Sequence, residues 1–217
     1  MLHKESINFL SELTKNNNRE WFTENKDWYE NSRKDFEQLV TELLDSISQF
    51  DIQTRYLNPK KCIFRIYRDI RFSKDKTPYK THFGAVFNEK KGSGFYIHIQ
   101  PNNNFLSCGF YDLTSKQIKN VRKGIEENFE EFKSILSESK FKKEIGDLSR
   151  DSDVLKRVPA GFDIESPAVE YLKLKRFYVT KPFAQEKLFT NSFIEYTTNL
   201  YKIMHPIYEF LEEFAHE

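Results

Sequence analysis

Apolar residues in the first part of the chain recur with the period of a helix. They do so between residues 7 and 13 and again from about Asn25 to Phe50. Spacings of three and four residues place such side chains on one helical face. The asparagines before "REWF" interrupt the pattern, and Asn17 or Asn18 can cap a new helix because its side-chain oxygen accepts a free backbone N–H. The pattern predicts helices over residues 1–50.

The periodicity changes at "CIFRIYRDIRF", where polar and apolar residues alternate. Alternate residues of a strand face opposite sides. One face would carry Phe64, Ile66, Arg68, Ile70 and Phe72. The other would carry Ile63, Arg65, Tyr67, Asp69 and Arg71. The runs "THFGAVF", "FYIHIQ" and "FLSCGFY" follow, separated by the turn-forming "NEKKGSG" and "PNNN". We expect an antiparallel meander over residues 60–111.

Helical spacing returns at Thr114, where "TSKQ" has the form of a capping box. The apolar positions of this helix continue to Leu136. A further helix is expected to start at Ser166–Pro167, and "KRFYVT" could add a short strand. The last helix should carry its apolar face from Phe193 to Phe214, with a kink at Pro206.

These elements together predict an α+β fold. The central, mainly antiparallel sheet would have about four to six strands, flanked by N-terminal and C-terminal helices. No change in composition marks a boundary, so residues 1–217 are expected to form a single domain, mainly helical over residues 114–217.

Charge is concentrated in one segment of a chain whose formal net charge is only +1. Between Lys60 and His82 there are eight Lys/Arg and two Asp, a local charge of +6. The remaining residues carry 26 Lys/Arg against 31 Asp/Glu. A positive segment on a mildly acidic body is typical of an anion-binding site.

Arg65 and Arg71 would flank Asp69 on the polar face of the predicted strand. A guanidinium binds phosphate or carboxylate through two parallel hydrogen bonds, and Lys76 and Lys80 in the following loop could add positive charge. The same alternation is also typical of cross-strand ion pairs, and loop lysines are usually only solvated.

Arg68 falls on the apolar face, where a charge is costly unless it is paired. Asp75 in the loop is the partner we expect. That pair would be structural and would tie the loop to the strand, leaving Arg65 and Arg71 free for a ligand.

Three residues are candidates for proton transfer: Asp69, Tyr79 and His98. His98 shares a strand face with Tyr96 and Gln100, and an imidazole in a strand is either a hydrogen-bonded wall residue or an acid–base group. His82 is a weaker candidate. No spacing of His, Cys or carboxylates indicates a metal site, and Cys62 and Cys108 are expected to be buried thiols.

The segment "PKKCIFRIYRDIRFSKDKTPYKTHFG" resembles the signature of an uncharacterised bacterial and fungal family, domain of unknown function 2461. The resemblance also covers "NNNREWFTENKDWYE", "GFYIHIQPNNNFLSCGFY", "IKNVRKGI" and "RVPAGFD", and so nearly the full chain. Its motif positions correspond here to Arg65, Arg68, Asp69, Arg71, Phe72, Asp75, Lys76, Pro78, Tyr79, Lys80, Gly109 and Arg122. The family usually has paired tyrosines and paired glycines where this sequence has Phe95–Tyr96 and Cys108–Gly109.

The resemblance implies a fold and a motif, without an assigned activity, cofactor or catalytic residue. Three functions therefore remain open. The first is a site for a small phosphate- or carboxylate-bearing ligand, with or without catalysis. The second, less favoured by the low net charge, is nucleic-acid binding through basic and aromatic residues. The third is a structural or interaction role in which the motif only ties loop to sheet.

The sequence also bears on where the protein acts. No stretch approaches the ~20 apolar residues of a membrane span, and "MLHKESINFL" lacks the apolar core of a signal peptide. We therefore expect a cytoplasmic protein with no membrane partner. The sequence indicates no particular cofactor or oligomeric state.

Overall fold

The computed structural model describes residues 1–89, 92–150 and 154–215. Its contacts divide the chain into two compact units. The first unit comprises Met1–Glu89, Tyr96–Leu106 and Pro182–Thr198. The second comprises Lys90–Phe95, Ser107–Lys181 and Asn199–Glu217. That the chain folds as a single domain stays a prediction.

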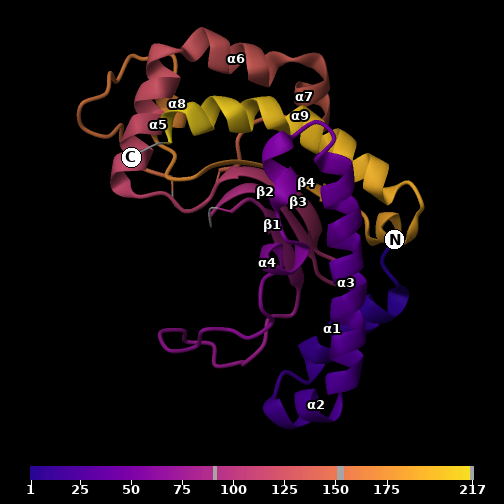
Figure 1. Cartoon of the computed structure of the whole chain (residues 1–217). Helices are drawn as coiled ribbons and strands as arrows, with labels where there is room; N and C mark the ends of the chain where they lie inside the picture. The colour runs from indigo at the N-terminus through magenta and orange to yellow at the C-terminus, as the bar shows by residue number, and fades with distance from the viewer. Residues whose placement is uncertain (90–91, 151–153, 216–217) are drawn as a thin grey trace. The chain divides into compact units, whose positions relative to one another are not determined.

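The first unit begins with the helices that the apolar spacing predicts (Figure 1). They are α1 (Lys4–Lys15), α2 (Arg19–Glu24) and α3 (Lys26–Ile47), followed by the 3-10 helix η1 (Ile52–Tyr56) and α4 (Pro59–Cys62). Asn18 is the residue that caps α2, since its side chain accepts the Trp21 N–H at 2.9 Å. A second 3-10 helix, η2 (Gln185–Phe189), also belongs to this unit.

Aromatic rings fill the core of the first unit. Phe9 is fully buried and its ring lies 6.3 Å from that of Phe83, and Phe36 also stacks on Phe83 at 5.3 Å. Phe9 also contacts Trp21 and Tyr29. Because each aromatic side chain buries a large area, these rings compensate for a chain that is only 38% hydrophobic.

Four strands form one antiparallel sheet in the order β1-β2-β3-β4. They are β1 (Phe83–Phe87), β2 (Ser93–Ile99), β3 (Asn104–Phe110) and β4 (Phe177–Phe183). The last of these is the extra strand expected from "KRFYVT". Together with the flanking helices, the sheet confirms the α+β class and its strand number.

The prediction of a strand over "CIFRIYRDIRF" was wrong. This segment makes only two isolated bridges, Ile63 to Ala85 and Tyr67 to Tyr79, and the sheet begins at Phe83. Instead, the chain between α4 and β1 projects from the rest of the first unit as a loop (Figure 1). Its faces do not follow the expected alternation either, since Phe72 is 94% exposed.

A shift in register explains why no continuous strand forms. Phe64 donates its N–H to the carbonyl of Gly84, whereas Lys80 donates its N–H to the carbonyl of Ile66. Between these two hydrogen bonds, one segment advances by two residues, from Phe64 to Ile66, and the other by four, from Lys80 to Gly84. The extra residues bulge at Thr81 and His82, as in an enlarged β-bulge, and interrupt the ladder.

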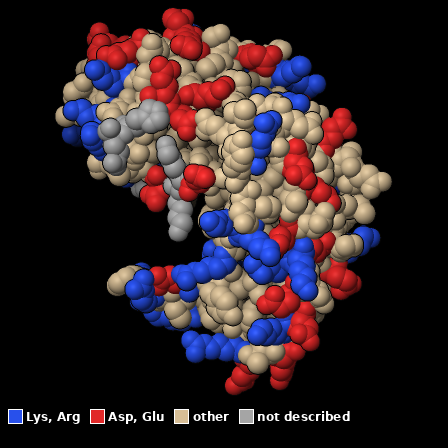
Figure 2. Space-filling view, viewed as in Figure 1, with Lys and Arg blue, Asp and Glu red and all other residues tan. Residues whose placement is uncertain are grey.

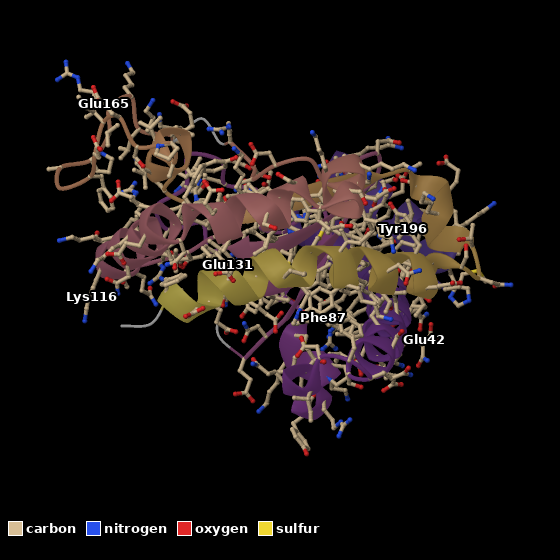
Figure 3. All side chains as sticks on the ribbon, turned by 90° about the horizontal axis from the view of Figure 1, so that it is seen from above. Glu42, Phe87, Lys116, Glu131, Glu165 and Tyr196 are labelled. Carbon is tan, nitrogen blue, oxygen red and sulfur yellow. The ribbon has the colours of Figure 1, made fainter. Side chains whose placement is uncertain are left out.

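The second unit contains five helices or parts of helices among its described residues. They are α5 (Ser115–Glu127), α6 (Phe129–Ser137), α7 (Ser139–Glu144), α8 (Val169–Leu172) and the greater part of α9 (Phe193–Phe214). The capping box at Thr114 is confirmed, and Lys116 in the first turn of α5 extends into solvent (Figure 3). The expected helix to Leu136 is broken at Asn128, whose side chain donates to the Gly124 carbonyl as the helix ends.

Phe95, Cys108 and Gly109 lie in packed positions. Phe95 is fully buried, and its ring lies 4.6 Å from that of Tyr201. The side chain at this position therefore packs without a hydroxyl group. Gly109 keeps a φ of 132°, and a Cβ there would lie 2.3 Å from the Phe177 carbonyl oxygen. This glycine is required by the close backbone approach. Both thiols, Cys62 and Cys108, are free and buried as expected.

None of the helices within the described ranges has the length and apolar character needed to cross a bilayer.

Gly124→Ala should destabilise the protein, although alanine favours helices over glycine by about 1 kcal/mol. A Cβ at this position of α5 would lie 2.2 Å from the ring of Phe214. Overpacking of this kind costs about 1–3 kcal/mol, measurable by denaturant unfolding. The control is Lys119→Ala on the exposed side of the same helix. An unfolding free energy equal to or above that of the wild type would contradict this packing.

Candidate functional site

Lys and Arg side chains gather on the loop that projects between α4 and β1 (Figure 2). We refer to residues 64–82 as the basic segment. It carries all the site residues predicted from sequence except His98. What the segment can bind depends on which of its charged groups are already satisfied by neighbours.

Arg68 makes the contacts expected of a structural tie. Its guanidinium donates to the carboxylate of Asp75 and to the hydroxyl of Thr77, and also to the Thr77 carbonyl at 3.2 Å and the Ser73 hydroxyl at 3.4 Å. The predicted Arg68–Asp75 ion pair is therefore present, and it closes the loop between them. Hydrogen bonds from Thr77 and from Arg68 lower the pKa of Asp75 to about 2.

Arg71 is not free, contrary to the expectation from strand alternation. Its Nε and one terminal nitrogen bind the two carboxylate oxygens of Asp69 at 3.0 and 2.7 Å. The hydrogen bonds from Arg71 lower the pKa of Asp69. A carboxylate held by a bidentate guanidinium is a weak base, so this pair argues against Asp69 as a proton acceptor. Both side chains are exposed, and a ligand would have to compete with this pair for Arg71.

Lys76 and Tyr79 also make contacts within the protein. The Lys76 ammonium donates to the Ile70 carbonyl at 3.0 Å. Tyr79 is 5% exposed and its ring stacks on Phe22 at 3.9 Å. The side chain of Asn17 accepts the Tyr79 N–H and donates to the Tyr79 carbonyl, at 3.1 and 2.9 Å. Burial raises the pKa of the Tyr79 phenol, which suits a packing residue better than an acid.

Lys80 and Arg65 form no ion pair with a carboxylate of the described residues, although the charge of Arg65 contributes to lowering the pKa of Asp69. The Lys80 ammonium lies 5.0 Å from the centre of the Phe64 ring. Burial, and then the positive charge of Arg65, lower the pKa of Lys80. Two cations that repel each other in this way are stabilised by any anion that binds between them.

His98 lies in a chain of hydrogen bonds along one face of β2. The Gln100 amide donates to the Thr81 hydroxyl at 3.0 Å, so its carbonyl oxygen faces the Nε2 of His98 at 3.1 Å. Nε2 must therefore carry the imidazole proton, and Nδ1 accepts from the Tyr96 hydroxyl at 2.8 Å. The predicted shared face of Tyr96, His98 and Gln100 is confirmed by these contacts.

The imidazole of His98 is also held from both sides. Phe105 stacks on one side, with ring centres 4.5 Å apart and planes 11° apart, and His82 contacts it at 4.2 Å. Burial lowers the pKa of His98. Burial, His98 and Lys80 lower the pKa of His82 to about 3. Both imidazoles are therefore neutral at physiological pH.

We call Arg65, Lys80, Thr81, His82, Tyr96, His98, Gln100 and Phe105 the His98 cluster. From the sequence, His82 was only a weak candidate, because the bulge that turns this residue toward His98 has no signature in the sequence. In the sequence, Tyr96 was linked to His98 only through their alternation on one strand. Burial raises the pKa of the Tyr96 phenol, so its hydroxyl proton stays available to the imidazole.

A metal ion has no evident ligand set here. Across residues 1–89, 92–150 and 154–215, no three His, Cys, Asp or Glu side chains gather as metal ligands would. Arg122, another family position, donates to the Leu174 carbonyl at 2.7 Å and is 8% exposed, which places it in the packing of the second unit.

Comparison with known families matches residues 5–210 of this chain to the family described as "Conserved hypothetical protein (DUF2461)". The match covers nearly the whole chain, including the basic segment and the His98 cluster. Neither the curated proteins nor the solved structures contain a match.

Arg68→Ala should destabilise the protein by about 1–3 kcal/mol, because a half-buried guanidinium with several hydrogen bonds is removed and the loop loses its tie. Arg65→Ala, which removes an exposed side chain, should change the free energy of unfolding by less than about 0.5 kcal/mol. Denaturant unfolding of the two variants measures the contrast. Equal effects would show that Arg68 does not hold the loop.

The Asp75 contacts should stabilise the fold in a defined pH range. The folded-state pKa of Asp75, about 2, lies below its ordinary value of 3.8. The stabilisation by the Asp75 contacts is therefore fully present at pH values above the ordinary pKa, and it is lost as the pH falls through the folded-state pKa. Melting temperatures of the wild type and Asp75→Asn should converge between pH 4 and pH 2. A constant difference down to pH 2 would refute the assignment.

Proposed function

We propose that this protein, which belongs to the conserved hypothetical family DUF2461, binds a small phosphate- or carboxylate-bearing ligand at the His98 cluster. The observation that carries the proposal is that the half-buried Lys80 lies close enough to Arg65 for their charges to interact, while neither side chain forms an ion pair with a carboxylate of the described residues. Elsewhere in the basic segment, Arg68 and Arg71 already bind carboxylates.

The surroundings of Lys80 favour an organic anion over a free inorganic ion. The Phe64 ring lies under the ammonium and 5.9 Å from the Tyr96 ring, which provides apolar surface for the body of a ligand. Small-molecule sites typically combine such surface with a few polar groups that fix orientation. The oxyanion would bind Lys80 and Arg65, and the rings would contact the rest.

The Tyr96–His98 pair supplies acid–base chemistry to such a ligand. The Tyr96 hydroxyl donates to His98, so its oxygen has lone pairs free to accept a proton from the ligand. As the Tyr96 oxygen takes that proton, the phenolic proton moves to Nδ1 of His98 and the imidazole becomes a cation. Gln100 holds the ring in the required orientation throughout. Of the three candidates from sequence, His98 is the one that this proposal retains for proton transfer.

Nucleic-acid binding is a second candidate, favoured by two exposed aromatic side chains of the basic segment. Tyr79 is buried and Tyr96 is engaged with His98, but Phe72 is 94% exposed and Tyr67 is 51% exposed. Both belong to the basic segment, and exposed rings beside cations can stack bases. Binding of an RNA or DNA single strand that weakens steeply with salt would support this candidate.

Lys80→Gln should abolish ligand-dependent stabilisation. A panel of phosphate esters and carboxylates at constant ionic strength should include compounds that raise the wild-type melting temperature by roughly 3–6 °C at about tenfold excess over Kd. The variant is compared with its own ligand-free melting temperature, and the control is Lys74→Gln, an exposed lysine of the same loop. The proposal would be contradicted if the ligands stabilised Lys80→Gln as much as the wild type. It would also be contradicted if no compound of the panel stabilised the wild type at millimolar concentrations.

A further inference from the structure

A pocket separate from the His98 cluster lies within the first unit, where the turn between α1 and α2 meets the basic segment. It has a volume of about 430 Å³ and is open to solvent. The turn contributes Asn17, Asn18 and Arg19. The basic segment contributes Ile70, Lys76, Thr77 and Pro78. The lining therefore contains two cations and no acidic residue.

The polar groups that line this pocket are mainly donors. The side chain of Arg19 is exposed and forms no hydrogen bond or ion pair with any described residue, although its charge acts on the Tyr79 phenol. Lys76 uses one of its three N–H groups on the Ile70 carbonyl, which holds the ammonium in place and leaves two N–H groups for a ligand. The Asn18 oxygen caps α2, so the remaining polar group of that side chain is its NH₂.

The acceptors near the pocket are already used. Both groups of the Asn17 amide bind the backbone of Tyr79. The Thr77 hydroxyl accepts from Arg68 and donates to Asp75. The Asp75 carboxylate in turn accepts from Arg68 and from the Thr77 N–H. A ligand entering this pocket meets N–H donors and positive charge, which suits an oxyanion and disfavours a cation.

The geometry points to a second anion-binding site in this pocket, in which Arg19 and Lys76 hold the phosphate group of a small phosphate ester. The Arg19 fork matches two phosphate oxygens, and Lys76 supplies a point charge. Ile70 and Pro78 give the pocket an apolar wall for the organic part of the ester. This site shares only the basic segment with the His98 cluster and does not depend on the function proposed there.

The pocket is preorganised by contacts outside its lining. Asn17 clamps Tyr79 from the α1–α2 side, and Arg68 holds the loop around Thr77 from the other. Neither wall has to be ordered when a ligand binds, which reduces the entropic cost of binding.

The test is a titration of ¹⁵N-labelled protein with inorganic phosphate and with methyl phosphate at constant ionic strength. Backbone amide signals of residues 17–19 and 76–77 should shift and saturate. Arg19→Gln, an exposed change that leaves the clamp intact, should weaken binding roughly tenfold, as expected for loss of a bidentate charge-assisted contact. Lys26→Gln, an exposed lysine of α3 outside the lining, should bind as the wild type does.

Two results would overturn this assignment: no saturable shift at these amides, or equal phosphate affinity of Arg19→Gln and the wild type. A titration with acetate in place of phosphate tests the ligand class. Equal affinity for acetate and phosphate would show that the pocket is a general oxyanion site and would contradict a phosphate-specific one. The imidazole signals of His82 and His98, followed in the same titration and in Lys80→Gln, report separately on the His98 cluster. Each site can therefore fail without the other.

Discussion

The arrangement of the basic segment depends on the guanidinium of Arg68. It binds Asp75, Thr77 and Ser73 at once and so closes a loop that has almost no ladder hydrogen bonds of its own. Since a partly buried cation is costly when unpaired, the loop conformation that satisfies Arg68 is strongly favoured over others. Once closed, the loop presents Lys76 to the pocket and brings Tyr79 onto Phe22.

The same contacts divide the cations of the segment by what remains available to a ligand. Arg68 and Arg71 are neutralised by Asp75 and Asp69, each a few residues away in the chain. Lys80 and Arg65 form no ion pair of this kind among the described residues, and burial keeps Lys80 from being fully solvated. Positive charge that is not neutralised by an ion pair therefore lies at the base of the loop, beside the neutral Tyr96–His98 pair. This distribution is the physical basis for placing anion binding next to an acid–base pair.

Sequence reasoning succeeded where neighbours in the chain determine the outcome. The helix α3, the capping box at Thr114 and the meander from Phe83 onward follow from local periodicity and capping. The Arg68–Asp75 pair was also predictable, because a charge on an apolar face needs a nearby partner. It failed over residues 62–72, where the alternation of a strand is present but the partner chain slips by two residues at Thr81 and His82.

The sequence by itself determined the fold class, the family and the segment in which charge accumulates, because periodicity, composition and motif are properties of the chain alone. Only the tertiary structure decided which charges are paired and which groups meet. Arg19 and Lys76 line one pocket although 57 positions separate them in the chain. The bulge brings the His82 ring into contact with that of His98, and the side chain of Asn17 forms the hydrogen bonds to the Tyr79 backbone that a neighbouring strand would otherwise form. Packing and side-chain hydrogen bonds between distant segments create these contacts, and such interactions leave no periodic pattern in a sequence.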